Sequence, residues 1–179
     1  MTTIDELIRN VSLARKLFIN QVENFTQEQA QWKPAPDVWN MVENTEHLFW
    51  AEHGGILGMW KTIDAIRAGK MERKYESVHQ NMPIEEIIEL TWKVRELVPA
   101  VAAPRMGGPL SFWCSSLNSL QGLLESFGHH LKNDELRLQA HPHPISGAMD
   151  FQQRFEFLSF HLDRHHAQVR GLIDEFNGI

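Results

Sequence analysis

Cysteine is almost absent from this sequence of 179 residues, since Cys114 is the only one. An intrachain disulfide is therefore impossible, and a chain without disulfides is typical of the cytoplasm, where we place this protein. A lone cysteine is more often a small buried hydrophobic residue than a catalytic thiol, and we interpret Cys114 in that way.

Long hydrophobic runs are also lacking. Residues 1–9 mix Asp5, Glu6 and Arg9 with apolar side chains, so they do not resemble a signal peptide. No later segment is long and apolar enough to predict a membrane-spanning helix. We expect no association with a membrane.

Basic clusters are missing as well. Lys and Arg number 17 against 23 Asp and Glu, and the formal net charge is -6. Because nucleic-acid binding depends on clustered basic side chains, no nucleic-acid partner is expected. Charged residues are spread along the chain and 42% of it is hydrophobic, which predicts a single domain over 1–179.

Apolar residues recur at helical spacing, and no segment alternates as a strand would. Thr3 with Glu6, and Asn40 with Glu43, have the spacing of capping boxes at helix starts. Residues 26–37 hold two prolines and predict a connector with at most one short turn. The fold class is therefore all-α, an antiparallel helical bundle. The helices are expected over residues 4–25, 40–69, 84–98, 116–137 and 150–176.

His161 and His165 are the strongest chemical signal in the sequence. Four residues apart, they lie on one face of a helix, one turn from each other, and can hold the same metal ion. His166 falls about 140° from His161 around the helix axis, so it is not expected to join them. Because ten histidines will produce such pairs by chance, this spacing alone is a moderate signal.

His47 is the candidate third ligand, on the helix expected from residue 40. Glu43 lies one turn before it, and capping the helix is the favoured role for this residue. Alternatively Glu43 supports a ligand, is itself a fourth ligand or acts as a general base. Gly54 and Gly58 lie near the line through His47, and either close helix packing or a substrate cavity would explain them.

The other histidines are expected to be structural or exposed. His53 lies about 120° from His47 around the helix, which makes it peripheral. His143 has one further possibility, because its proline-rich loop could fold over the mouth of the bundle. The rest of this group are His79, His129, His130 and His141.

Three features together resemble the DinB-like (DinB/YfiT-like) family of metalloenzymes. The first is Trp32-Lys33-Pro34, followed by Trp39 and, eight residues later, His47. The closing segment 161–168 is similar to the family's pair of histidines with a glutamine three residues beyond. The loop 141–147 is similar to the His-Pro and Gly loop that precedes this helix in some members.

The resemblance implies a four-helix bundle with up-down-down-up connectivity, frequently a homodimer. It also implies a divalent metal ion held by His47, His161 and His165, and we expect zinc or nickel there. The helix expected near 116–137 would be an addition to the bundle. Two positions depart from the family, which often has Ser at Asn40 and His at Arg164, and neither is a ligand position.

Three neutral imidazoles leave a metal ion with an open position, which is typical of a catalytic site. An ion with an open position can activate water or bind a thiolate. The resemblance implies both outcomes, so the expected function is a metal-dependent enzyme, either a hydrolase or a transferase that uses a low-molecular-weight thiol, acting on a small molecule. The alternatives are a non-catalytic bundle that binds a metal or ligand, and a bundle whose histidines are core residues without a metal.

Overall fold

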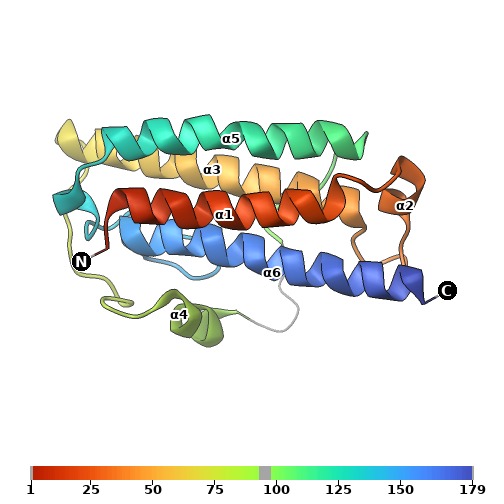
Figure 1. The fold of residues 1–179 in the computed structure, drawn as a ribbon. Coiled ribbons are helices and arrows are strands. Elements are labelled where there is room, and N and C mark those ends of the chain that lie inside the picture. The colour runs from red at the N-terminus through yellow and green to blue at the C-terminus, as the bar shows by residue number, and fades with distance from the viewer. Residues whose placement is uncertain (1, 93–97, 179) are drawn as a thin grey trace.

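A computed structural model describes residues 2–92 and 98–178. Its four long helices lie side by side (Figure 1) and are α1 (Ile4–Val22), α3 (Met41–Arg67), α5 (Leu110–His130) and α6 (Phe151–Asn177). Three short elements connect them: α2 (Gln27–Gln31), α4 (Ile84–Thr91) and the 3₁₀ turn η1 (Asn133–Glu135). Pairing between extended segments of the described residues is limited to two isolated bridges, so the predicted all-α class is confirmed.

The four long helices have up-down-down-up connectivity. Figure 1 shows α1 and α6 running from left to right, whereas α3 and α5 run from right to left. Helix α1 packs against α5 and α6, and α3 packs against the same two helices. The parallel pair α3 and α5 requires a long crossover, which carries α4.

Side-chain caps begin the helices where the sequence predicts them. Thr3 and Glu6 form a capping box on α1, and Asn40 and Glu43 form another on α3. In each box the first side chain accepts from a backbone N–H that has no partner within the helix, while the Glu carboxylate accepts from the cap residue. The predicted single turn after Thr26 is α2.

The helix expected at 116–137 as an addition to the bundle is corrected in range and in role. It is α5, which starts directly after Pro109 and packs against α1 and α3 as one of the four. The added helix is α4, which packs on α6. Helix α4 is also shorter than expected, because Trp92 is extended (φ -99°, ψ 142°) and ends it. Residues 93–97 of the expected range lie outside the described residues.

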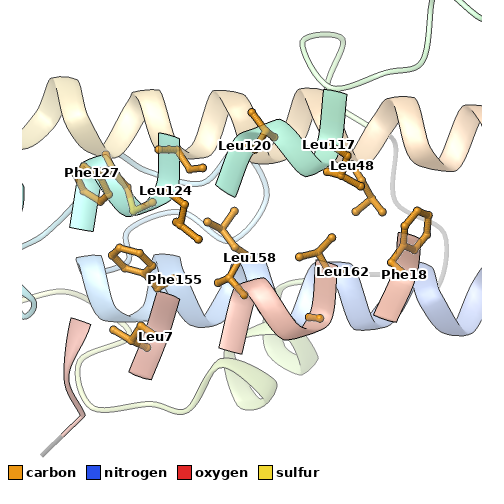
Figure 2. Packing of buried hydrophobic residues seen from close by; sticks show 14 of the residues in the cluster. Leu7, Phe18, Leu48, Leu117, Leu120, Leu124, Phe127, Phe155, Leu158 and Leu162 are labelled. Atoms are coloured by element: carbon orange, nitrogen blue, oxygen red, sulfur yellow. The ribbon is translucent and has the colours of Figure 1, made fainter. Parts of the chain in front are cut away.

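Buried apolar side chains from all four long helices form the main core (Figure 2). Phe18, Phe127 and Phe155 are completely buried. Full burial of one such side chain stabilises a fold by roughly 1.5–3 kcal/mol. A second cluster joins α4 to α6 and the segment before it; its buried members are Ile84, Ile87, Ile88, Met149 and Phe157.

Within residues 2–92 and 98–178, no helix combines the length and the apolar character that a bilayer span requires.

Candidate metal centre

Three histidines from two helices meet in the interior. His47 comes from α3, and His161 and His165 from α6, and each is at most 6% exposed. The Nε2 atom of His161 lies 3.1 Å from Nε2 of His47 and 3.2 Å from Nε2 of His165. The histidines that the sequence singles out as ligands are therefore brought together.

Hydrogen bonds on the outer ring nitrogens orient two of the three imidazoles. His47 Nδ1 donates to the carbonyl oxygen of Ala102 at 2.8 Å. His165 Nδ1 donates to Asn44 Oδ1, also at 2.8 Å, while the amide nitrogen of Asn44 donates to the carbonyl of Asn40. Because these protons are on Nδ1, the Nε2 atoms of His47 and His165 present lone pairs to His161.

This donor set fits a divalent metal ion. Metal–nitrogen bonds of about 2.0–2.1 Å in tetrahedral geometry separate the nitrogens by roughly 3.3 Å, close to the observed spacing. Without an ion, lone pairs of neighbouring nitrogens face each other, and one proton on His161 can relieve only part of that repulsion. The cluster His47, His161 and His165 can therefore hold a metal ion.

Burial keeps all three imidazoles neutral at pH 7. It lowers the pKa of His47 to about 4, against a smaller opposing effect of the bond to Ala102. Burial, followed by the neighbouring histidines, lowers the pKa values of His161 and His165 well below the usual range. A metal ion therefore meets nitrogens that need not lose a proton before they bind it.

A cleft of about 1050 Å³ opens beside the three histidines. Aromatic rings form its walls near the cluster. The Phe157 ring stacks on His161 with 5.3 Å between centroids, and the Trp39 ring lies 5.0 Å from that of His47. Trp92, at the end of α4, lies 6.3 Å from His161. The cluster is therefore buried from bulk water but lines a space large enough for a small molecule.

Glu46 supports the site, although it is not among the candidate residues that the sequence suggests. Its carboxylate accepts the backbone N–H groups of Arg105, Met106 and Gly107 at 2.8–2.9 Å. Burial would raise the pKa of Glu46, but these bonds outweigh it and lower the pKa. Glu46 thus fixes the segment whose Ala102 carbonyl orients His47. The available signal in the sequence was an acidic residue directly before a candidate ligand.

Glu43 lies outside the cluster. One carboxylate oxygen accepts the backbone N–H of Asn40, and the other pairs with Lys33 at 2.7 Å. Both oxygens are thus engaged in capping α3 and in an ion pair, and Glu43 does not line the cleft. The capping interpretation is confirmed, and nothing in this geometry supports Glu43 as a base.

The remaining histidines lie apart from the three Nε2 atoms. His166 and His53 are not in the cluster, as their helical positions predict. His79 is buried and bonded to the carbonyl of Ser146, a structural role. His143 lines the cleft, with its ring 4.4 Å from Phe157, and its Nδ1 accepts two backbone N–H groups of its own loop. The possibility raised for His143 is thus met only in that its loop borders the cleft, and His143 is not one of the clustered ligands.

The two interpretations of the glycines on α3 apply to different residues. A Cβ atom on Gly58 would lie 2.5 Å from the ring of His141, so this glycine permits close packing. A Cβ atom on Gly54 would meet nothing within 4 Å, and Gly54 lines the cleft. Gly54 therefore fits the second interpretation, in which a missing side chain leaves space in the cleft.

This difference predicts opposite effects of one substitution. Gly54→Ala should raise the free energy of unfolding by about 0.5–1 kcal/mol, because alanine favours the helix and meets no neighbour. Gly58→Ala should instead lower it by about 1–2 kcal/mol, because displacing His141 outweighs the same helical gain. Urea unfolding of the two variants measures both changes; a stabilised Gly58→Ala protein would contradict the packing role.

Comparison with known sequences agrees with this geometry. The sequence profile of the DinB superfamily matches residues 11–169, nearly the whole chain. The chain belongs to the DinB superfamily. The matched region of this DinB chain includes all three clustered histidines. No curated protein sequence matches this chain.

The DinB bundle also has a counterpart among solved structures. It is similar to a crystal structure of a conserved protein from Enterococcus faecalis, with a TM-score of 0.53 and 13% sequence identity. The similarity covers 96% of this chain and 95% of the other. At this level of identity the likeness concerns the fold of the DinB bundle alone.

Proposed function

We propose that this DinB protein binds a divalent metal ion, zinc or nickel, through His47, His161 and His165, and uses it as an enzyme acting on a small molecule. The observation that carries the proposal is the convergence of three Nε2 atoms, with the orientation of two rings set by hydrogen bonds. Histidines without a metal would not need lone pairs that face one another.

An open coordination position supports a catalytic role. Among the described residues, the group of potential ligand atoms at this place consists of three histidines, with no carboxylate or thiol beside them. Such a set is typical of catalytic rather than structural sites. When bound, a divalent ion would supply a Lewis acid that lowers the pKa of a water molecule or a thiol.

The residues around the open coordination position determine which reactions it could support. Asn44 and the Ala102 carbonyl hold the rings of His165 and His47, and Phe157 and Trp39 restrict water. Hydrolysis and transfer to a low-molecular-weight thiol both fit such a site. The rival function is a non-catalytic metal-binding bundle. A homodimer and a cytoplasmic location remain predictions.

Cobalt substitution of the purified protein tests the proposal. The protein stripped by a chelator should take up about one Co²⁺ per chain and give the absorption spectrum of a site with few ligands. Added 2-mercaptoethanol should produce a thiolate-to-cobalt charge-transfer band, because the open position accepts a thiolate.

The result distinguishes a metalloenzyme from a bundle without metal and from a non-catalytic metal-binding bundle. Absence of stoichiometric metal after reconstitution would refute the metal site. A bound cobalt whose spectrum responds neither to the thiol nor to azide would indicate a closed coordination sphere, which favours the non-catalytic bundle.

A further inference from the structure

Arg154 on α6 is a buried cation that forms no ion pair with an acidic residue of the described part of the chain. Its side chain is 4% exposed, and Nη2 donates to Nε2 of His141 at 2.9 Å. Its Nε and Nη1 atoms are buried and have no hydrogen-bond partner among the residues that the structure describes. Burial lowers the pKa of Arg154 to about 10, so it stays charged at neutral pH.

The neighbouring His141 adds a further unused donor. Because its Nε2 accepts from Arg154, the ring proton is on Nδ1. Within residues 2–92 and 98–178, this buried Nδ1 has no hydrogen-bond partner. Three neighbouring N–H donors, on Nε and Nη1 of Arg154 and Nδ1 of His141, therefore have no acceptor among the described residues. Buried polar groups in native proteins are almost always paired, which points to an acceptor that binds from outside.

This corner belongs to the cleft that contains the metal centre. Arg154 and His141 both line it, and the guanidinium carbon lies 5.7 Å from the centroid of the Phe157 ring. Since Phe157 stacks on His161 at 5.3 Å, the guanidinium lies within about 11 Å of that ligand ring. Two helical turns separate Arg154 from His161, roughly 10 Å along the axis.

The opposite wall, on α3, brings no charge to the guanidinium at its point of closest approach. A Cβ atom on Gly55 of α3 would lie 3.7 Å from Nη2 of Arg154, and Gly54 next to it faces open space. Of the acidic residues that line the cleft, Glu175 lies about six turns further along α6, roughly 30 Å away, and Asp37 precedes the start of α3.

We propose that Arg154 and His141 form an anion-binding subsite, which holds the carboxylate or phosphate group of a small molecule whose apolar part lies against Phe157. Guanidinium and imidazole N–H groups bind oxyanions strongly where water is excluded. The subsite deepens the proposed function, because it defines the substrate as an elongated anion that reaches from Arg154 to the histidines.

Calorimetric titration with model ligands tests the subsite. The probes are 4-phenylbutyrate, phenyl phosphate and the neutral 4-phenylbutyramide. At least one anionic probe should bind the wild-type protein about tenfold or more tightly than the amide. Arg154→Met, which keeps an apolar side chain, should remove this preference. The two anions distinguish a carboxylate from a phosphate ligand.

Matched controls separate the subsite from the metal. Arg164→Met removes another arginine of the cleft, one that lies over the Trp92 ring, and should leave the preference intact. Chelator-treated wild-type protein should retain it too, so the subsite can hold even where the metal proposal fails. Equal affinity in Arg154→Met and wild type, or no preference for either anion in the wild type, would overturn the proposal.

A second variant guards against loss of folding. Arg154→Lys keeps the cation but loses the planar donor set, so it should bind the anion about 3–10-fold more weakly than wild type. Circular dichroism confirms that each variant is folded. Wild-type affinity in Arg154→Lys together with unchanged binding in Arg154→Met would assign Arg154 to structure alone.

Discussion

His161→Ala should abolish stoichiometric metal binding, whereas His166→Ala should leave it intact. His161 is the central residue of the cluster, because its Nε2 lies 3.1 Å and 3.2 Å from the other two nitrogens. Loss of its imidazole leaves two ligands and a larger cavity between them. The affinity for zinc should fall by about 100-fold or more, since even residues that only orient a ligand contribute about 10–100-fold.

His166 makes a strict control because it has the same chemistry on the same helix and points away from the cluster. Elemental analysis gives the stoichiometry, and competition with a chromogenic chelator gives the affinity. Asn44→Ala should fall between the two variants, at about 10–100-fold weaker binding, because it frees the ring of His165. Equal losses in His161→Ala and His166→Ala would refute the assignment of faces.

Thermal unfolding provides an independent measure. A metal ion at 1,000 times its Kd stabilises the native state by about 4 kcal/mol when it does not bind the unfolded chain. Zinc should therefore raise the Tm of wild type and of His166→Ala, but not that of His161→Ala. Without metal, His161→Ala should be no less stable than expected for a lost core side chain, because its removal also relieves the facing lone pairs.

Local spacing was enough to predict the pair His161 and His165 and the starts of α1, α3, α4 and α6. His47 joined the pair through the family resemblance, and α5 begins earlier than its spacing indicated. The distance of four between His161 and His165 fixes their common face whatever surrounds the helix. The Asn40 and Glu43 capping box likewise depends on residues three apart. Even the choice between roles for Glu43 followed from this local geometry. Such features could be read without the tertiary structure.

Features that depend on distant parts of the chain could not be read in this way. Glu46 acts on residues 105–107 of the crossover, and Arg154 acts on His141 of a loop. The role of α5 in the bundle depends on its packing against α1 and α3, and its serine-rich first half weakened the helical pattern. Each of these pairings is set by the long-range packing of the bundle.

Arg15→Met should destabilise the protein by about 3–5 kcal/mol, although it lies away from the cleft. Arg15 of α1 forms an ion pair with Glu52 of α3, and the two side chains are only 2% and 3% exposed. Without Arg15, Glu52 would be a buried charge with no counterion, and removal of one partner from such a pair has a cost of this size. Urea unfolding at pH 7 measures the loss.

The double variant Arg15→Met/Glu52→Leu should regain most of that stability. Apolar side chains of similar volume often replace a buried ion pair at no loss. Arg15 also donates to Oε1 of Gln121 on α5. In the double variant this oxygen would still accept a hydrogen bond from Ser12, at 2.7 Å. A double variant as unstable as Arg15→Met would show that the pair contributes through packing rather than charge.

The pH dependence of these two variants isolates Glu52. Burial raises the pKa of Glu52, and Arg15 opposes that shift, so Arg15→Met should raise the pKa further. A raised pKa means that the native state takes up a proton before the unfolded state does as the pH falls. The stability of Arg15→Met should therefore recover relative to the double variant between pH 7 and pH 5, by up to about 1.4 kcal/mol per pH unit. A constant difference between the two variants across this range would mean that Glu52 is not the charge responsible.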